Sequence, residues 1–334
     1  MAIPGVAGPT MTDTVGHYRL LDRIGTGGLG EVYRARDLRL GRTVAIKLLS
    51  PRLAADDPLG GAFRRDAMAA AALSHPGIAT LFEVGTDEGR GFLVYEYVPG
   101  QTLRTLIASG PFNPKRAVGF AIQLADALAE ANAHGVLHGD LKPDNVMVTP
   151  RGRAKLLDVG LARWTRGGVI RRHVDEHVAR GSSAALNTLA YMSPEQVQGD
   201  QDDHRSDVFS LGAVLFEMLT GQSPFLRSTA AETVTGVMES APVAPSSLNP
   251  NVPRSLDVVL GRVLSKASYA RHGSAAALAE ALRTVASRLE GRQAPVARAG
   301  RTTSGWGVPR KGARLWLALA VLAGLAATLW VWGG

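Results

Sequence analysis

The sequence predicts an α+β fold in two lobes, a small β-rich lobe followed by a larger helical lobe, with one more helix in the apolar stretch 315–332. Short β-type runs come first in the chain, at residues 18–25, 31–37, 43–49, 79–84 and 92–97. Helical runs then dominate, with an early one near 62–73 and later ones at 115–134, 206–219, 255–264 and 274–289. Because strands and helices are segregated along the chain, we do not expect a doubly wound parallel sheet, in which they alternate.

The composition is that of a globular protein with a sizeable core, since 46% of the 334 residues are hydrophobic and 20% are charged. There are no cysteines, which excludes disulfides, thiolate metal sites and cysteine nucleophiles. The net charge is +8, but six basic residues lie in 291–314, a stretch without any acidic residue. The basic character therefore belongs to a short tail, and we expect no nucleic acid among the partners.

Changes of composition along the chain predict four parts. Residues 1–17 form a flexible leader, 18–290 the folded body, 291–314 a basic linker and 315–332 a transmembrane helix. The last segment has eighteen residues and no charge. As a helix it would be about 27 Å long, close to the hydrocarbon thickness of a bilayer. A buried helix of a soluble core is the alternative, but the segment has no amphipathic face.

The flanks of the apolar segment predict its orientation. Three cations within 310–314 precede it and no charge follows it. The positive-inside rule then places the body in the cytoplasm, so we expect a single-pass protein of the cell membrane with the lipid bilayer as a partner. Ala320, Gly324 and Thr328 recur every four residues. Such a small-residue stripe lets two helices approach closely, which leaves a homodimer open.

The first motif with chemical meaning is a glycine-rich run between two β-type runs, Gly25-Thr26-Gly27-Gly28-Leu29-Gly30. A dinucleotide fingerprint would open a helix, whereas these glycines turn a hairpin whose tip, without Cβ atoms, lets backbone N–H groups approach phosphates. Seventeen residues after Gly30, the apolar run 44–47 ends in Lys47. A lysine on a strand beneath such a hairpin is placed to hold nucleotide oxygens.

A second cluster is His138-Gly139-Asp140-Leu141-Lys142-Pro143-Asp144-Asn145, and Asp158-Val159-Gly160 begins thirteen residues after it. The first of these segments combines the carboxylate of Asp140, the lysine Lys142 and the amide of Asn145, and the second adds the carboxylate of Asp158 after a short β segment. Phosphoryl transfer uses these parts as a base for the incoming hydroxyl, a cation for the moving phosphoryl group and oxygen ligands for magnesium. A polar surface loop would explain any one of these residues but not all of them in this order.

With these motifs in place, residues 18–289 resemble the bacterial Hanks-type, or eukaryotic-like, serine/threonine protein kinases. Ser193-Pro194-Glu195, the run 207–212 and Arg271 follow in the order of that family. The lysine at position 142 and the threonine at position 188 resemble the residues of the serine/threonine branch of the family rather than those of tyrosine kinases. The resemblance implies the bilobal protein-kinase fold for 18–290, carried by a C-terminal transmembrane anchor.

The resemblance also implies an activity, the transfer of the γ-phosphoryl group of Mg-ATP to serine or threonine of proteins, including the chain itself. Asp140 would be the catalytic base, and Lys142 would contact the γ-phosphoryl group. Asn145 and Asp158 would hold Mg²⁺ or Mn²⁺. The residues expected to bind ATP are Ile24, Gly25, Thr26, Gly27, Gly28, Leu29, Gly30, Glu31, Val32, Lys47, Glu96 and Val98.

Two ion pairs are implied by the family pattern. Glu195 would pair with Arg271 and tie the activation segment to the helical lobe. Lys47 would pair with Asp66, which stands where the family has a glutamate and is one methylene shorter. Gly139 replaces the arginine that usually reads a phosphate on the activation segment. Full activity and its regulation by phosphorylation are therefore open.

Other functions remain as alternatives. A pseudokinase would bind nucleotide as a scaffold with little transfer, but four residues that transfer requires are all present: Lys47, Asp140, Asn145 and Asp158. A small-molecule phosphotransferase shares part of this pattern and is disfavoured by the features at 193–195 and 207–212, which build a peptide-docking platform in protein kinases. His173-Val174-Asp175-Glu176-His177 matches a zinc-peptidase pattern, yet it lies in a long charged segment and is better interpreted as a solvated loop.

Overall fold

The structure is a computed structural model, and it describes residues 14–27, 29–50, 61–162, 164 and 183–291. Most of the predicted leader, the basic linker and the apolar segment 315–332 lie outside these stretches. Among the helices within them, none combines the length and the apolar character that a membrane crossing needs.

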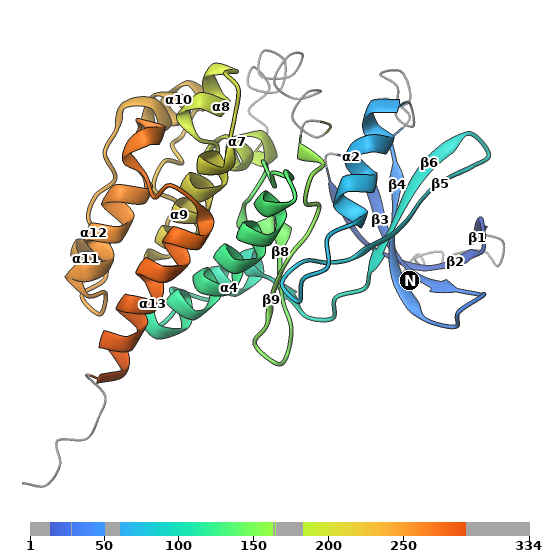
Figure 1. Cartoon of the computed structure of the whole chain (residues 1–334), viewed down its shortest axis with the longest axis horizontal. Helices are drawn as coiled ribbons and strands as arrows, with labels where there is room; N and C mark the ends of the chain where they lie inside the picture. Colours follow the sequence, from blue (N-terminus) through green and yellow to red (C-terminus); the bar gives the residue numbers. More distant parts are fainter. Residues whose placement is uncertain (1–13, 28, 51–60, 163, 165–182, 292–334) are drawn as a thin grey trace, which may run out of the picture. The chain divides into compact units, whose positions relative to one another are not determined.

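The first lobe is built on a six-stranded antiparallel sheet with the strand order β1-β2-β3-β4-β6-β5 (Figure 1). Its strands are β1 Thr14–Val15, β2 Tyr18–Gly27, β3 Gly30–Asp37, β4 Thr43–Leu49, β5 Leu81–Asp87 and β6 Arg90–Glu96. Helix α2 (Gly61–Ala71) packs on this sheet through the buried side chains of Phe63, Ala67 and Ala70. The five predicted strands therefore correspond to β2 through β6, and the predicted helix near 62–73 corresponds to α2.

The glycine-rich run closes the β2–β3 hairpin, in which Gly27 is the register partner of Gly30. Gly30 has a φ of +149°, a conformation that favours glycine. A Cβ atom at this position would lie 1.9 Å from the carbonyl oxygen of Leu48 on β4. The close approach of the two strands therefore requires glycine here. Leu29, at the tip of the hairpin, is fully buried.

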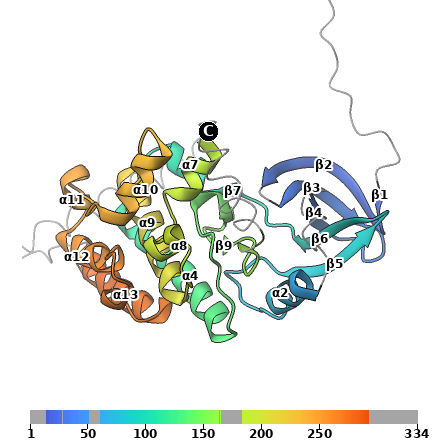
Figure 2. The same cartoon turned by 90° about the horizontal axis from the view of Figure 1, so that it is seen from above.

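The second lobe is mainly helical. Its helices are α3 Leu103–Ala108, α4 Pro114–Ala133, α7 Ser183–Leu189, α8 Pro194–Gln198, α9 His204–Thr220, α10 Ala230–Glu239, α11 Pro245–Leu248, α12 Arg254–Val263 and α13 Ala275–Gly291. Two short 3-10 helices are Pro143–Asn145 and Ser268–Ala270. A small antiparallel sheet lies between the helices and the large sheet (Figure 2), and its strands are β7 Gln101–Thr102, β8 Val146–Val148 and β9 Ala154–Leu156.

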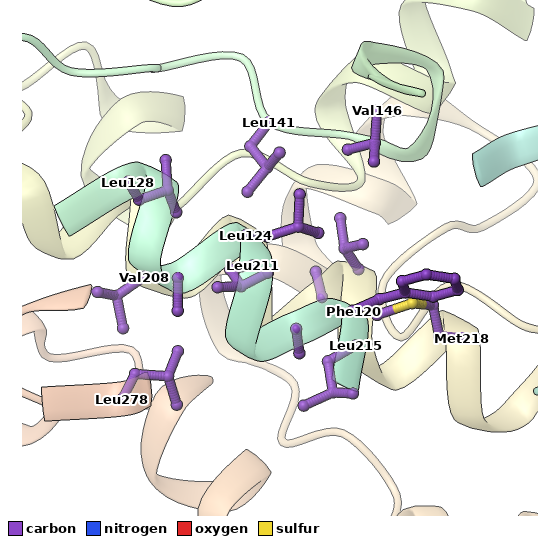
Figure 3. Packing of buried hydrophobic residues seen from close by; sticks show 14 of the residues in the cluster. Phe120, Leu124, Leu128, Leu141, Val146, Val208, Leu211, Leu215, Met218 and Leu278 are labelled. Atoms are coloured by element: carbon purple, nitrogen blue, oxygen red, sulfur yellow. The ribbon is translucent and has the colours of Figure 1, made fainter. Parts of the chain in front are cut away.

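The core of the second lobe forms where α4, α9 and α13 pack together. In α9 every residue from Ser206 to Leu219 is buried, so this helix is surrounded by other elements on all sides. Figure 3 shows side chains of all three helices in one cluster, among them Phe120, Leu124, Leu128, Leu211, Leu215 and Leu278. A helix enclosed in this way is a rigid support for any loop attached to it.

Polar caps define the ends of the helices near the candidate site. The side chain of Asp203 accepts a hydrogen bond from the backbone N–H of Arg205 at the start of α9, and Gly221 ends that helix in the left-handed conformation. In α8, Ser193 and Gln196 form a capping box, in which each side chain bonds the other's backbone N–H. The side-chain amide of Gln196 also contacts the backbone of Gly139.

Candidate active site

Lys47 on β4 and Asp158, which follows β9, form an ion pair between the two lobes. The lysine Nζ lies 2.5 Å from both carboxylate oxygens. The Lys47 side chain is only 7% exposed, so the pair is largely shielded from water and stronger than a surface ion pair. The predicted phosphate-binding cation and the predicted metal ligand are thus brought to one point.

The expected pair between Lys47 and Asp66 is wrong for this structure. Lys47 bonds Asp158 instead, and the carboxylate of Asp66 on α2 accepts a hydrogen bond of 2.7 Å from the indole Nε1 of Trp164. The physical reason is competition, because Asp158 supplies the charge that Lys47 needs and Trp164 supplies a donor to Asp66. The spacing of the motifs cannot distinguish the two arrangements, since both use the same residues.

The second cluster of the sequence forms a compact loop around Asp140. The Nζ of Lys142 lies 3.0 and 2.9 Å from the two oxygens of Asp140 and also donates to the hydroxyl of Thr188 at 3.0 Å. The side-chain amide of Asn145 donates to the carbonyl oxygen of Asp140 at 2.7 Å and to its carboxylate at 3.2 Å. Two neighbouring donors therefore orient the carboxylate of Asp140.

The backbone of this loop is held from below by Asp207 on α9. Its buried carboxylate accepts from the N–H of His138 at 2.9 Å and from the N–H of Gly139 at 2.7 Å. Gly139 has a φ of +73°, which glycine adopts without strain. The side-chain amide of Gln196 donates to the carbonyl oxygen of Gly139 at 3.3 Å. The loop is therefore positioned by protein groups on both sides of the residue that replaces arginine.

The β8–β9 hairpin places the two predicted metal ligands at its open end. Val146 pairs with Leu156 in register, and the N–H of Leu157 donates to the carbonyl oxygen of Asn145 at 2.9 Å, directly before Asp158. The amide nitrogen of Asn145 donates to Asp140, and its amide oxygen is the atom that could bind a cation. The carboxylate of Asp158 already receives a positive group, the Lys47 ammonium. A carboxylate and an amide oxygen fit the preference of Mg²⁺ or Mn²⁺ for hard oxygen ligands.

The chain leaves the first lobe after Glu96, the last residue of β6. The N–H of Glu96 donates to the carbonyl oxygen of Thr80 at 2.8 Å, so this backbone donor is engaged within the first lobe. Its carboxylate forms an ion pair with Lys155 on β9, at 2.7 and 2.6 Å. Val98, which is also among the residues expected to bind ATP, is buried. Burial, followed by the charge of Asp158, raises the pKa of the neighbouring Tyr95 well above its usual range.

Comparison with known proteins agrees with this geometry. The family model described as the protein kinase domain matches residues 18–282. The chain belongs to the protein kinase family. Its two lobes are therefore the sheet-based N-lobe and the helical C-lobe of the bilobal kinase fold.

Curated relatives and solved structures agree on the family. The serine/threonine-protein kinase PknB of Mycobacterium leprae is 37% identical over 264 residues, which is 78% of this chain and 41% of that protein. The serine/threonine-protein kinase PrkC of Bacillus subtilis is 34% identical over 261 residues, 78% of this chain and 39% of that protein. The crystal structure of the Mycobacterium tuberculosis PknI kinase domain superposes with a TM-score of 0.65 at 27% identity, covering 84% of this chain and all of that domain. This chain thus spans less than half the length of these two curated relatives.

In this kinase the ion pair between Glu195 and Arg271 is present. The guanidinium donates to the two carboxylate oxygens at 2.7 and 2.9 Å, and the Arg271 side chain has no exposed surface. Burial raises the pKa of the Glu195 carboxyl, but the hydrogen bonds from Arg271 and Ser206 outweigh this effect and lower the pKa to about 2. The pair joins the start of α8 to the segment before α13, as the family pattern implied.

One polar centre near the site escaped the sequence reasoning. Arg104 on α3 donates to Asp144 of the catalytic loop at 3.0 Å, to Glu217 of α9 at 2.6 Å and to the hydroxyl of Tyr191 at 2.9 Å. Tyr191 in turn donates to Glu217. These residues have no fixed spacing in the sequence, so only their opposite charges could have indicated that they interact. Charge alone does not identify which residues become partners. The contact with Arg104 thereby fixes Asp144 of the catalytic loop in place.

Some predicted features lie outside the described residues. They are Gly28 of the glycine-rich run and the motif from His173 to His177. Among the residues that the structure does describe, no group of three or more histidine, aspartate or glutamate side chains could hold a metal ion.

Proposed function

We propose that the chain is an ATP-dependent serine/threonine protein kinase that transfers the γ-phosphoryl group of ATP to serine or threonine of proteins, including itself. The observation that carries the proposal is the carboxylate of Asp140, oriented between Lys142 and Asn145, with Lys142 also bonded to Thr188. Curated relatives named serine/threonine-protein kinases support it. Because the chain spans only part of those relatives, its own substrates and partners need direct tests.

The residues act by holding groups in place and by moving one proton. Asp140 would accept the proton of the incoming hydroxyl, as a positioned base does. Lys142, already beside that carboxylate, would place a positive charge next to the moving phosphoryl group. Asn145 and Asp158 would hold Mg²⁺, which when bound neutralises phosphate charge. Lys47 would hold phosphate oxygens once it separates from Asp158.

The test uses the purified full-length chain in detergent with radiolabelled ATP, Mg²⁺ and a generic acceptor protein. We expect incorporation on serine or threonine, and Asp140→Asn or Lys47→Met should lower the rate by at least about a hundredfold, the scale of losing a positioned base or charge clamp. Asp126→Asn, which changes an exposed ion pair on α4, is the control and should keep the rate. Wild-type incorporation by Asp140→Asn would contradict the proposal.

A pseudokinase is the alternative with an observation in its favour. Lys47 and Asp158 occupy each other, and Gly139 replaces the family arginine. A pseudokinase would bind Mg-ATP but transfer nothing measurable in the assay above. An active kinase would bind Mg-ATP and transfer its phosphoryl group, and it would lose transfer in the Asp140→Asn and Lys47→Met variants.

We also propose that residues 315–332 anchor the chain in the cell membrane with the kinase domain in the cytoplasm. The support is the uncharged run itself and the cations at 310–314 before it. Full-length protein should stay with membranes through high salt and alkaline carbonate and leave only in detergent. Recovery in the carbonate supernatant would overturn the anchor. Chemical crosslinking of the membrane-bound protein would detect a dimer that forms through Ala320, Gly324 and Thr328.

A further inference from the structure

An acidic site beside the catalytic loop is filled by the chain's own Arg104, on α3. The guanidinium donates to the carboxylates of Asp144 and Glu217 at 3.0 and 2.6 Å and to the hydroxyl of Tyr191 at 2.9 Å. Its Nε also donates to Asp144, at 3.3 Å, so four of its five N–H groups are engaged. We call Asp144, Tyr191 and Glu217 the guanidinium site, because together they match the donors of an arginine.

Two segments that hold the predicted catalytic base also form walls of the guanidinium site. Lys142 and Thr188 contact each other beside Asp140. Asp144 comes two residues after the first of them, and Tyr191 comes three residues after the second. Because an extended residue spans at most about 3.6 Å, these walls begin within about 7–11 Å of the residues beside Asp140. An acceptor hydroxyl at Asp140 would bring substrate residues two or three positions away within reach of the site.

The electrostatics of the guanidinium site require a cation. The Glu217 side chain is only 7% exposed, so its charge is costly unless it is paired. Burial, and then the charge of Glu217, raise the pKa of Tyr191 above its usual range, so its hydroxyl stays protonated and donates to that carboxylate. The side chains of Arg104 and Asp144 are 28% and 45% exposed, so water reaches one side of the site. A guanidinium from another chain could therefore enter if Arg104 were absent.

We infer that Arg104 sets the substrate specificity of this kinase by filling, from within the chain, a site that would otherwise bind an arginine of the protein substrate. The acceptors are then serine or threonine residues that need no arginine two or three positions away. Removal of Arg104 opens the site and makes such an arginine favourable. This inference rests on the proposed function, because it concerns the substrates of that same active site.

The test compares the full-length chain in detergent with its Arg104→Ala variant on matched peptides. Each peptide has one acceptor serine in a neutral sequence, with either arginine or glutamine at one position between three before and three after it. We expect the wild type to phosphorylate both members of each pair with similar kcat/KM. Arg104→Ala should prefer the arginine member at one or more positions by at least about tenfold, the scale of a hydrogen bond between charged groups. The preference should lie mainly in KM, because the arginine contributes binding and the reacting groups are unchanged.

Three further variants assign the preference to the guanidinium site. Arg104→Lys keeps a cation in place and should behave like the wild type. Glu217→Gln in the Arg104→Ala background removes the buried charge and should abolish most of the preference. Arg283→Ala, which removes an arginine from the exposed pair with Asp126, is the matched control and should leave the two peptides equal.

A stability measurement tests the opened site without phosphoryl transfer. Ethylguanidinium at millimolar concentration should raise the melting temperature of Arg104→Ala and leave that of the wild type unchanged, because only the variant has a free site. Tetramethylammonium, a cation without N–H donors, should raise neither. If Arg104→Ala is too unstable to purify, Arg104→Gln removes the same charge, keeps a hydrogen-bond donor and is tested in its place.

The outcomes separate this inference from the proposed function. Equal use of the paired peptides by the opened variant, or a wild type that prefers the arginine member as strongly as the variant does, would overturn the inference. Phosphoryl transfer is observed in both of these cases, so the proposed function would stand. Absence of transfer in every protein would contradict the proposed function instead. The melting temperatures then still decide the inference, because a variant that ethylguanidinium does not stabilise has no guanidinium site to fill.

Discussion

Replacing Glu195 by glutamine removes the negative charge of a buried ion pair and keeps the shape of the side chain. Arg271 would then be left as a buried cation without its counter-charge, and breaking a buried pair in this way costs about 3–5 kcal/mol. Three backbone carbonyl oxygens, of Arg205, Ser265 and Lys266, also accept from the guanidinium and compensate part of the loss. We therefore expect the lower end of the range, a decrease of about 3 kcal/mol in the free energy of unfolding.

The pKa of Glu195 leads to a similar magnitude. Its depression from an ordinary value of 4.5 to about 2 corresponds to about 3 kcal/mol at 1.36 kcal/mol per pKa unit, and water around the partly exposed carboxylate reduces this to about 2 kcal/mol. Because the folded-state pKa is lowered, the contribution is fully present above pH 4.5 and is lost as the pH falls from there toward 2. The difference between wild type and Glu195→Gln should shrink accordingly at pH 4.

Urea titration at pH 7 measures the effect directly. The matched control is Asp126→Asn, which removes the charge from another carboxylate–guanidinium pair. Its partner is Arg283, whose guanidinium nitrogen lies 2.8 Å from the Asp126 carboxylate. The side chains of Asp126 and Arg283 are 37% and 47% exposed. An exposed pair contributes about 1 kcal/mol or less, so the control should change little. A loss below about 1 kcal/mol for Glu195→Gln, or one equal to that of the control, would refute the reasoning from burial.

Three further predictions concern backbone strain, regulation and pH. Gly139→Arg places a side chain at a left-handed φ of +73° and should lower the free energy of unfolding by about 1–2 kcal/mol in urea titration, despite restoring the family residue. With no cation at Gly139, phosphatase treatment should leave kinase activity nearly unchanged, and a loss restored by rephosphorylation would contradict this. Burial, and then the charge of Arg262, lower the pKa of His272 below 6.5. The contribution of the neutral His272 to the free energy of unfolding is therefore fully present above pH 6.5 and decreases as the pH falls below it. Thermal denaturation at several pH values should show a smaller decrease in His272→Gln than in the wild type.

The strands and long helices were predictable because each carries its own pattern. The run 43–49 coincides with β4, and 115–134 differs from α4 by one residue at each end. Helices α7, α8 and α10 were not predicted, since the first two are short and α10 is identified mainly by its capping box at Thr229 and Glu232. Strands β7 to β9 have two or three residues each, too few for a period, and exist because distant segments pair.

The candidate site shows a similar division. Motif order identified Lys47, Asp140, Asn145 and Asp158, and the folded chain brings them into one region. The partner of Lys47 could not be predicted, because it depends on which of two arrangements the chain adopts. The Lys155 ion pair with Glu96 could not be predicted either, since it joins residues 59 positions apart that share no motif. Long-range side-chain pairs depend on the packing of whole elements.

The support of the catalytic loop by α9 has a consequence for the making of the protein. The carboxylate that holds the amides of His138 and Gly139 belongs to Asp207, which is 69 and 68 residues further along the chain, and Arg104 needs Glu217, which is 113 residues further. A chain still on the ribosome that has not yet released α9 contains every residue of the transfer chemistry but lacks the Asp207 carboxylate that holds the backbone of the loop. We therefore expect nascent fragments to bind and transfer nothing, so that a cell is not exposed to the activity of a half-made, unregulated enzyme.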